Sequence, residues 1–507
     1  MTSPLPVGDW PGRGARHGAG RTAVQDPDVR LSYGTLEERS DRLAHRFREA
    51  GYRRGDRIAT VTANSADHVV TFFGCAKAGI VLAPLSWRAA ASELAALLSD
   101  AEPALVLTDS ERRDAVDRTC GRAGPPVTVL GPQGVEEEVP PAGSSGDRQG
   151  AVASMDDPVL LLYSSGSTGR AKGVPLSHRN CWSTNQSLAA RIGLTEQDVV
   201  LVVLPQFHVA AWNVQPLLAW LTGARVLVER SFDPGRVLRR VSGERVTVMM
   251  GVPTAYQMIA AQPGFAAADL SSLRLALVGG APTTPPVRDA WAARGVPLVP
   301  GYGLTEAGPN VLCQPEDGSD MVPYPGVQVT LRDPVTGRPV DGPGRGELLV
   351  GGGGVFGGYW RRPEETRRVL AGGWLATGDL AERTNEGRYR IVGRSSAMYI
   401  SGGENVHPAE VEQALLRDPD VATAAVVGVP DDRWGEVGVA FVVPHPGARI
   451  DPERVRQNVR RHLAGFKVPR WVVVVQELPL TGSGKIDRPR LRGEATGAAR
   501  EPGRSGE

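Results

Sequence analysis

The sequence is poor in cysteine, in lysine and in long apolar runs, and each shortage narrows what the protein can be. No uninterrupted apolar stretch reaches the roughly 18 residues of a membrane helix, and the N-terminal residues contain no apolar core of a secretory signal. The four cysteines, Cys75, Cys120, Cys181 and Cys313, are far apart and lack the spacing of a metal site. The net charge is only +1, so nucleic acid or an anionic membrane is not expected as the main partner. We expect a cytoplasmic protein with free thiols, not inserted in a membrane.

Lysine is the scarcest of the charged residues. Of the 57 lysines and arginines only four are lysine, namely Lys77, Lys172, Lys467 and Lys485. Lys172 and Lys485 lie in glycine-rich segments. A lysine is a compact, mobile charge, whereas arginine is a wide planar fork. These two lysines are therefore candidates for places where the fork does not fit.

A chain of 507 residues is too long for one compact core, so at least two domains are expected. Short runs rich in valine, isoleucine and leucine occur at 58–61, 199–204, 225–228 and 273–278, and helical patterns occur at 35–50, 66–79 and 89–100. This alternation predicts an α/β fold with layers of largely parallel strands.

The pattern changes twice in the second half of the chain. After about residue 326, closely spaced strands with glycine and proline turns predict a β-rich subdomain, to which we assign the turn-like segment 351–360. From 398 onward the pattern is mixed, with helices expected at 408–417 and 452–464 and strands at 421–429, 437–443 and 471–477. The expected organisation is a large multi-layer N-terminal domain over 1–393, a hinge over 394–397 and a small, mobile α+β C-terminal lid over 398–507. The tails 1–25 and 490–507 are rich in glycine, arginine, proline and serine, and are predicted to be mobile.

The most informative segment is SSGSTGRAKGV at 164–174, which follows an apolar run at 159–163 that reads as a buried strand. Glycines let a backbone turn sharply, and successive N–H groups in such a turn bind anions. Hydroxyl groups and one lysine add further donors and a charge, so the segment suits phosphate. The candidate residues are Ser164, Ser165, Gly166, Ser167, Thr168, Gly169 and Lys172. A flexible linker is the alternative, but linkers rarely follow a buried strand. Gly-Val after the lysine excludes the Walker pattern, in which serine or threonine stands there.

This segment resembles the phosphate loop of the adenylate-forming superfamily, which includes acyl-CoA synthetases, peptide-synthetase adenylation domains and luciferases. The resemblance runs from LSYGTLEERSDRLAHRF at 31–47 to LTGSGKIDR at 480–488, and its motifs are most similar to those of acyl-CoA synthetases. It implies a ligase that uses ATP and Mg²⁺ to convert a carboxylic acid into an acyl-adenylate and then transfers the acyl group to coenzyme A.

The resemblance also implies roles for particular residues. Tyr302 would stack on adenine, Thr305 would bind phosphate, and Glu306 would hold Mg²⁺. The other nucleotide contacts would be Gly280, Ala281, Pro282, Gly303, Asp379 and Arg394, and Lys485 would stabilise the charge of the adenylation transition state. Alone, these motifs also fit a buried turn with a capping glutamate, an ordinary Asx turn at 377–380 and a surface lysine.

The acyl and coenzyme A contacts follow in the same way. The acyl pocket would contain His208, Val209, Ala210, Ala211, Trp212, Val278, Gly279, Gly280, Gly303 and Leu304. Adenylation domains for α-amino acids carry an aspartate where this chain has His208, so a free amino acid is not expected, although a core histidine fits as well. Small residues leave room for a bulky or aryl apolar acid. The coenzyme A tunnel would be lined by Ser401, Gly402, Gly403 and Glu404.

The hinge departs from the family, because Ser396 and Ala397 stand where two charged residues are usual. A changed lid bias would favour one half-reaction over the other. Two alternatives therefore stay open: an enzyme that performs only the thioester-forming step on a preformed acyl-adenylate, and a ligase that loads a carrier protein. A luciferase-like oxygenase and a nucleotide-binding regulatory protein are further alternatives, and a homodimer is possible.

Overall fold

The computed structural model describes residues 3–130, 139–142, 154–165, 171–281, 283–394, 397–402, 404–481 and 486–500. Its packing divides the chain into two compact units, one of residues 1–329 and 350–375 and one of residues 330–349 and 376–507. The sequence had suggested a boundary at 394–397. The two units are defined by their internal contacts, which do not show where the chain bends. The position of the hinge therefore stays a prediction.

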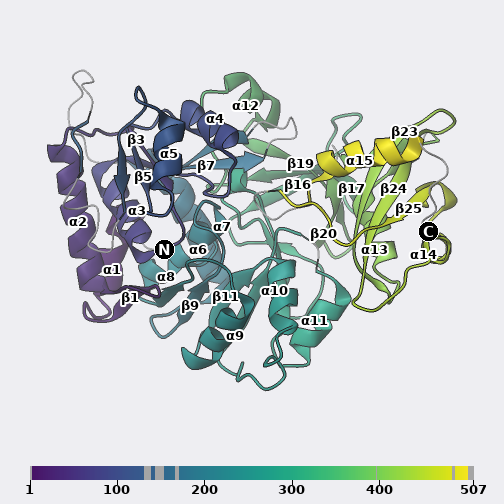
Figure 1. Ribbon diagram of the computed structural model, residues 1–507, viewed down its shortest axis with the longest axis horizontal. Coiled ribbons are helices and arrows are strands. Elements are labelled where there is room, and N and C mark those ends of the chain that lie inside the picture. Colours follow the sequence, from purple (N-terminus) through teal and green to yellow (C-terminus); the bar gives the residue numbers. More distant parts are fainter. Residues whose placement is uncertain are drawn as a thin grey trace. The chain divides into compact units, whose positions relative to one another are not determined.

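The first unit is built on two sheets (Figure 1). The larger has the order β15-β14-β13-β12-β11-β9-β10-β1-β2, and the smaller has the order β6-β5-β3-β4-β7-β8. The strands of the larger sheet are β1 Thr22–Gln25, β2 Arg30–Ser32, β9 Val199–Val202, β10 Arg225–Val228, β11 Val248–Gly251, β12 Leu275–Val278, β13 Leu298–Tyr302, β14 Leu312–Cys313 and β15 Val322–Pro323. The strands of the smaller sheet are β3 Arg57–Val61, β4 Val81–Pro84, β5 Leu105–Thr108, β6 Val127–Val129, β7 Pro158–Ser165 and β8 Ala171–Ser177. Strands β9 to β13 pair in parallel, so their carboxyl ends meet at one edge.

Helices of the first unit separate the strands, as the alternating pattern predicts. They are α1 Trp10–Ala15, α2 Tyr33–Glu49, α3 Ala66–Ala78, α4 Ala91–Ala101, α5 Arg113–Cys120, α6 His178–Ile192, α7 Ala210–Asn213, α8 Pro216–Thr222, α9 Pro234–Gly243, α10 Pro253–Ala260, α11 Pro285–Ala292 and α12 Pro363–Val369, with short 3-10 turns η1 Val7–Asp9 and η3 Thr305–Ala307. Helices α2, α3 and α4 confirm the predictions at 35–50, 66–79 and 89–100. Their ends have local causes: the Ser65 side chain accepts from the amide of His68, and Gly79 ends α3 with φ of 72°.

The prediction of a mobile N-terminal tail is wrong for its described residues. Trp10 is fully buried, and its ring meets that of Trp182 edge-on with centroids 6.0 Å apart. The amide of Val7 donates to Nδ1 of His178 at 3.0 Å. A single buried tryptophan removes a large apolar area from water, and this burial orders a segment whose composition is otherwise rich in glycine and arginine.

The second unit carries a sheet with helices on both faces. Its strands are β21 Tyr399–Ser401, β22 Glu404–Val406, β23 Val421–Asp431, β24 Gly435–Pro444 and β25 Trp471–Val474, and its helices are α13 Pro408–Leu415, α14 Pro452–Arg460 and α15 Arg488–Arg500 with the 3-10 turn η5 Gly465–Lys467. Alternate residues of β23 enter different cores: Val426 joins the cluster with α13 and α14, and Val427 joins the one with α15. This confirms the predicted α+β pattern.

A further sheet contains β16 Gln328–Arg332, β17 Gly344–Gly351, β18 Leu370–Ala371, β19 Trp374–Arg383 and β20 Tyr389–Arg394. The predicted strands after residue 326 correspond to β16 and β17. Strand β20 pairs with β19 in antiparallel register, with Asp379 opposite Arg394.

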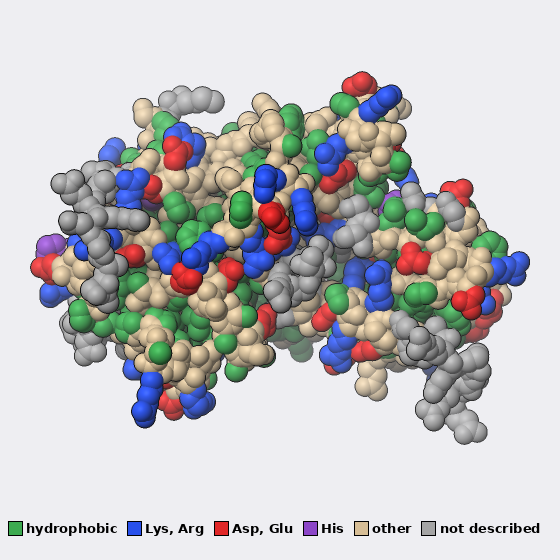
Figure 2. All heavy atoms as spheres, turned by 90° about the horizontal axis from the view of Figure 1, so that it is seen from above, with side chains coloured by type: hydrophobic (Ala, Val, Ile, Leu, Met, Phe, Trp, Pro, Cys, Tyr) green, Lys and Arg blue, Asp and Glu red, His purple; other side chains and the backbone are tan. Residues whose placement is uncertain are grey.

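No helix in the described part of the chain is long and apolar enough to cross a membrane. On the face drawn in Figure 2, basic and acidic side chains lie beside one another instead of gathering by sign. That distribution fits the net charge of +1.

The N-terminal packing generates a stability prediction. A Cβ at Gly14 would lie 2.3 Å from the Tyr33 ring and 2.4 Å from the carbonyl oxygen of Trp220. Because a backbone oxygen cannot move aside cheaply, Gly14→Ala should lower the free energy of unfolding by about 1–3 kcal/mol. Denaturant titration measures it. Gly20→Ala is the matched control, since nothing lies within 4 Å of its Cβ position, and an equal loss at both sites would contradict the packing argument.

Burial of His178 generates a second prediction, for pH. Burial lowers its pKa from 6.5 to about 4. Below pH 6.5 the unfolded chain therefore binds a proton at this histidine more readily than the folded chain does. The free energy that neutral, buried His178 contributes to folding is complete above pH 6.5 and is lost as pH falls towards 4, by about 1.4 kcal/mol per pH unit. His178→Gln should therefore reduce the stability difference between pH 7 and pH 5 by about 2 kcal/mol. His45→Gln, at an exposed histidine on α2, is the control in the same unfolding titrations, and an equal change in both variants would contradict the burial argument.

Candidate active site

The predicted phosphate segment begins at the end of one strand of an antiparallel hairpin and ends at the start of the other. Strands β7 and β8 pair in antiparallel register, with Ser164 opposite Lys172 and Ser165 opposite Ala171. The second strand was not predicted. Gly166, Ser167, Thr168 and Gly169 lie outside the described residues. The hairpin nevertheless brings both ends of the segment together, because paired residues face each other across the two strands.

Lys172 is held by two residues that follow in the sequence nearly 200 positions later. Its Nζ lies 2.5 Å from Oε2 of Glu365 and 5.0 Å from the ring centroid of Tyr359. The Lys172 ammonium, donating to that carboxylate, holds the pKa of Glu365 below its usual range. The ammonium group of Lys172 is therefore held in place by an ion pair with the carboxylate of Glu365.

Glu306 joins three segments of the first unit. It is 8% exposed, and its Oε1 accepts hydrogen bonds from Ser164 Oγ at 3.0 Å and from the Tyr359 hydroxyl at 3.1 Å. The turn that carries it needs glycine at 303, because a Cβ there would lie 1.4 Å from the carbonyl oxygen of Pro309. Tyr302 ends β13, and Thr305 begins η3 directly after Leu304. The predicted residues of this motif therefore lie next to the ends of the phosphate hairpin.

Sequence reasoning missed Tyr359 and Glu365. Segment 351–360 had been assigned to the β-rich subdomain, but it packs within the first unit, where the amide of Phe356 donates to the carbonyl oxygen of Glu306 at 2.9 Å and that of Trp360 to Gly173 at 2.8 Å. The signal was present, since an aromatic pair and an acidic helix start follow the glycines. Their partners lie too far away in sequence for local patterns to reveal them.

Asp379 and Arg394 belong to the second unit. They face each other across β19 and β20, and Arg394 Nε donates to Oδ1 of Asp379 at 2.8 Å. Asp379 is nearly buried and its amide donates to Oγ1 of Thr377 at 3.0 Å. The aspartate thus lies in a strand, and its carboxylate is paired with the second predicted ribose residue.

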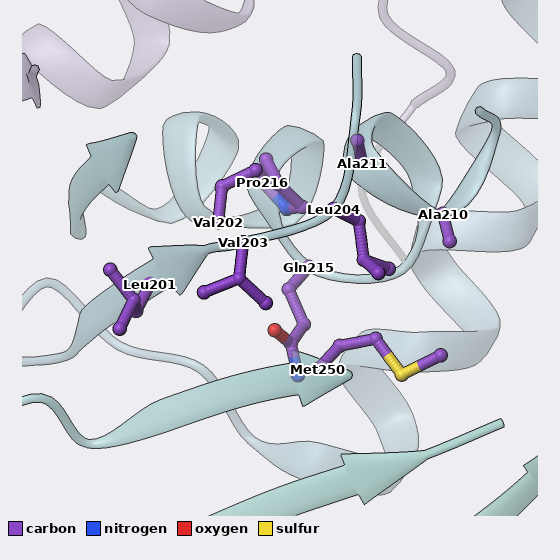
Figure 3. Close-up of a pocket in the computed structure, with 9 residues that line it drawn as sticks. All are labelled: Leu201, Val202, Val203, Leu204, Ala210, Ala211, Gln215, Pro216 and Met250. Carbon is purple, nitrogen blue, oxygen red and sulfur yellow. The ribbon is translucent and has the colours of Figure 1, made fainter. Parts of the chain in front are cut away.

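The predicted acyl residues surround the carboxyl ends of the parallel strands. Gly279 and Gly280 follow β12 after Val278, Gly280 has φ of 85°, and Ala281 follows it. Ala210 and Ala211, on α7 after Val209, line a small apolar pocket with Leu204 and Met250 (Figure 3). Trp212 is placed differently: its ring packs in the core against those of His68 and Phe72, and its Nε1 donates to the carbonyl oxygen of Gln206 at 2.7 Å. His208 is half-buried, with its ring 4.5 Å from that of Phe207.

The described coenzyme A candidates, Ser401, Gly402 and Glu404, lie where two antiparallel strands of the second unit meet. Ser401 ends β21 and pairs with Glu404, which begins β22. Gly402 has φ of 61°, and its amide donates to the carbonyl oxygen of Trp434 at 2.8 Å. A side chain here would be strained by the left-handed backbone. Gly403, the hinge residue Ser396, Pro282 and Lys485 lie outside the described residues.

Comparisons with known proteins identify the family of the chain. The family model of the AMP-binding enzyme matches residues 12–360, and that of the AMP-binding enzyme C-terminal domain matches residues 410–485. A feruloyl-CoA synthase from Amycolatopsis sp is 42% identical, with 96% of this chain and 98% of the relative covered. An indoleacetate–CoA ligase from Aromatoleum aromaticum is 34% identical with the same coverage. The crystal structure of ATP-bound MatB from Rhodopseudomonas palustris matches with a TM-score of 0.85 at 32% identity, covering 96% of this chain and 98% of that one.

The chain therefore belongs to the AMP-binding, adenylate-forming enzyme family. Within that family it is an ATP-dependent, AMP-forming acid–CoA ligase, which confirms the class predicted from its motifs.

The cluster at Glu306 generates a prediction about ATP. Tyr359→Phe removes one of the two hydroxyl donors that fix the carboxylate, and a hydrogen bond to a charged group contributes about 1.5–3 kcal/mol. We expect kcat/KM for ATP to fall about tenfold or more in a pyrophosphate-release assay. Tyr163→Phe is the matched control, because its hydroxyl donates at 2.9 Å to a different carboxylate, Oδ2 of Asp100. Equal losses in the two variants would show that the effect is general.

Proposed function

We propose that this ligase activates an aromatic carboxylic acid with ATP and transfers the acyl group to coenzyme A. The observation that carries the reaction is the convergence of Ser164, Tyr359 and Lys172 around the Glu306 turn. The small residues at Ala210, Ala211 and Gly279 support a bulky, flat acid, and so does the similarity to a feruloyl-CoA synthase over nearly the whole chain.

In the first half-reaction a carboxylate oxygen of the acid attacks the α-phosphorus of ATP, and pyrophosphate leaves. Lys172 and the hydroxyl and amide donors of the 164–172 hairpin would bind the phosphate chain. Tyr302 would stack on adenine, and Asp379 would accept from the ribose hydroxyls with Arg394 beside it. Lys485 would approach the reacting carboxylate and phosphate, where it stabilises developing negative charge without transferring a proton.

The residues at Glu306 fit a magnesium ion. Mg²⁺ prefers oxygen ligands and usually takes only one or two carboxylates from a protein, with phosphates and water completing the shell. The single carboxylate of Glu306 suits such a site, in which the phosphates of the substrate supply further oxygen ligands. Glu306 would hold the ion, with Ser164 and Tyr359 orienting its carboxylate. When bound, the ion neutralises charge on the phosphates.

In the second half-reaction the thiolate of coenzyme A attacks the acyl carbon of the adenylate, the bond to the phosphate oxygen breaks, and AMP leaves. The adenylate supplies the activation, so the protein mainly positions the two partners. The segment that begins with Ser401 and Gly402 would leave room for the pantetheine chain, because glycine has no side chain.

The assignment of Lys485 is tested by separating the two half-reactions. Lys485→Ala should lower pyrophosphate release by about 10²-fold or more, because one transition-state charge contact is lost. Thioester formation from a synthetic acyl-adenylate should stay largely intact. Lys467→Ala is the control, since it removes another of the four lysines, one that pairs with Glu410 at 2.8 Å. Equal loss of both half-reactions in Lys485→Ala would refute the assignment.

A further inference from the structure

Gln215 is a buried polar residue that the fold does not use. It lies between α7 and α8, where its carbonyl oxygen accepts from the amide of Ala219 at 2.9 Å. Its side chain makes no capping hydrogen bond to α8. The residue is 1% exposed, and its Nε2 has no hydrogen-bond partner in the described part of the chain. The helix junction therefore does not account for the presence of glutamine.

The surroundings of this amide are apolar. Figure 3 shows the Gln215 side chain directed towards Met250, within a pocket whose other lining residues are Leu201, Val202, Val203, Leu204, Ala210, Ala211 and Pro216. Burying an amide without a partner is unfavourable. A trapped water is a poor remedy, because it needs two to four polar partners and the lining offers one polar side chain. A partner supplied by a bound molecule resolves the imbalance.

The pocket borders the proposed acyl site. Ala210 and Ala211 line it and belong to the predicted acyl wall. The terminal methyl group of Met250 lies 3.1 Å from where a Cβ of Gly279 would stand, and the carbonyl oxygen of Gly301 is equally near. These glycines mark the carboxyl ends of β12 and β13, where α/β sheets bind ligands. Gln215 thus lies behind Met250, on the inner side of the acyl region.

Met250 supplies the opening between the two. It is only partly buried, and methionine is unbranched with three rotatable bonds, so it adapts to irregular ligands at little expense. A rotation of this side chain would join the space beside Gly279 to the Gln215 amide.

We infer that Gln215 is a specificity-determining residue that hydrogen-bonds an oxygen substituent at the far end of the acyl group. The inference rests on the proposed function and deepens it from an aromatic acid to a ring-oxygenated one. An amide carries both donors and an acceptor, so it can pair with a phenolic hydroxyl in either direction or donate to an ether oxygen. An unsubstituted ring would leave the amide buried and unpaired.

The test compares 4-hydroxycinnamic acid with cinnamic acid, which differ by one ring hydroxyl. For the wild-type enzyme we expect kcat/KM for thioester formation to favour the hydroxylated acid by about ten- to a hundredfold. Gln215→Met keeps the side-chain volume and removes the amide, and should reduce the preference to within about twofold. Gln215→Leu serves as a second variant. Both should match or exceed the wild type in thermal stability, since each removes an unpaired buried amide.

Gln206→Leu is the matched control. Gln206 is also buried, but its Oε1 accepts from the amide of Ser65 at 3.1 Å and lies 3.2 Å from Nδ1 of His68. This variant should lose stability and keep the wild-type preference.

The outcomes separate the two claims. If the wild type converts neither acid, the inference is refuted and the proposed function fails for cinnamic acids; if it converts both with equal kcat/KM, the proposed function stands and the inference is refuted. If both acids are converted and the Gln215 variants keep the wild-type ratio, the aromatic ligase activity stands and the role of Gln215 is refuted. A uniform loss for both acids, with lowered thermal stability, would assign Gln215 a structural role and equally refute the inference.

Discussion

The predicted nucleotide site depends on how the nearly buried carboxylate of Glu306 is hydrogen-bonded. Glu306 lies where water reaches poorly, so its charge needs donors from the protein. The donors are the hydroxyls of Ser164 and Tyr359, which are 142 and 53 positions away in sequence. Because both meet the same carboxylate oxygen, the phosphate hairpin, the β13 turn and the segment before α12 are fixed to one another. The position of each of these three segments therefore depends on the positions of the other two.

Lys172 adds a second condition at the same place. Its ammonium is paired with Glu365 and lies over the ring of Tyr359, which itself donates to Glu306. A ligand phosphate that binds Lys172 must therefore share or replace the carboxylate of Glu365. The pair with Glu365 keeps Lys172 from being an unpaired charge in the absence of a ligand, and a phosphate, which carries more charge than a carboxylate, could still compete for it.

The elements that local sequence rules predict are those with local causes. Helix α3 could be predicted because Ser65 caps its start and Gly79 ends it, and the parallel strands because they are buried on both faces and read as apolar runs. The phosphate segment was recognisable for the same reason, since its chemistry is contiguous. Trp10, Tyr359 and Glu365 were missed because each acquires its role from a partner more than fifty positions away. Hydrophobic periodicity does not indicate such distant partners, and the glycine-rich or arginine-rich composition around these residues favours a loop prediction.

Two buried glutamines, nine positions apart, differ in whether the protein supplies hydrogen-bond partners for their side chains. Gln206 meets a backbone amide and a histidine that themselves belong to the start of α3, so its polarity is used in holding two segments together. Gln215 has the same side chain and the same burial, yet its Nε2 meets only apolar neighbours. The side chain of Gln206 is hydrogen-bonded within the described part of the chain, whereas Nε2 of Gln215 is not. Leucine or methionine at position 215 would fill the same volume without leaving an unpaired amide. Natural sequences break local rules chiefly where function requires it, and the violation here borders the space that the acyl group would occupy.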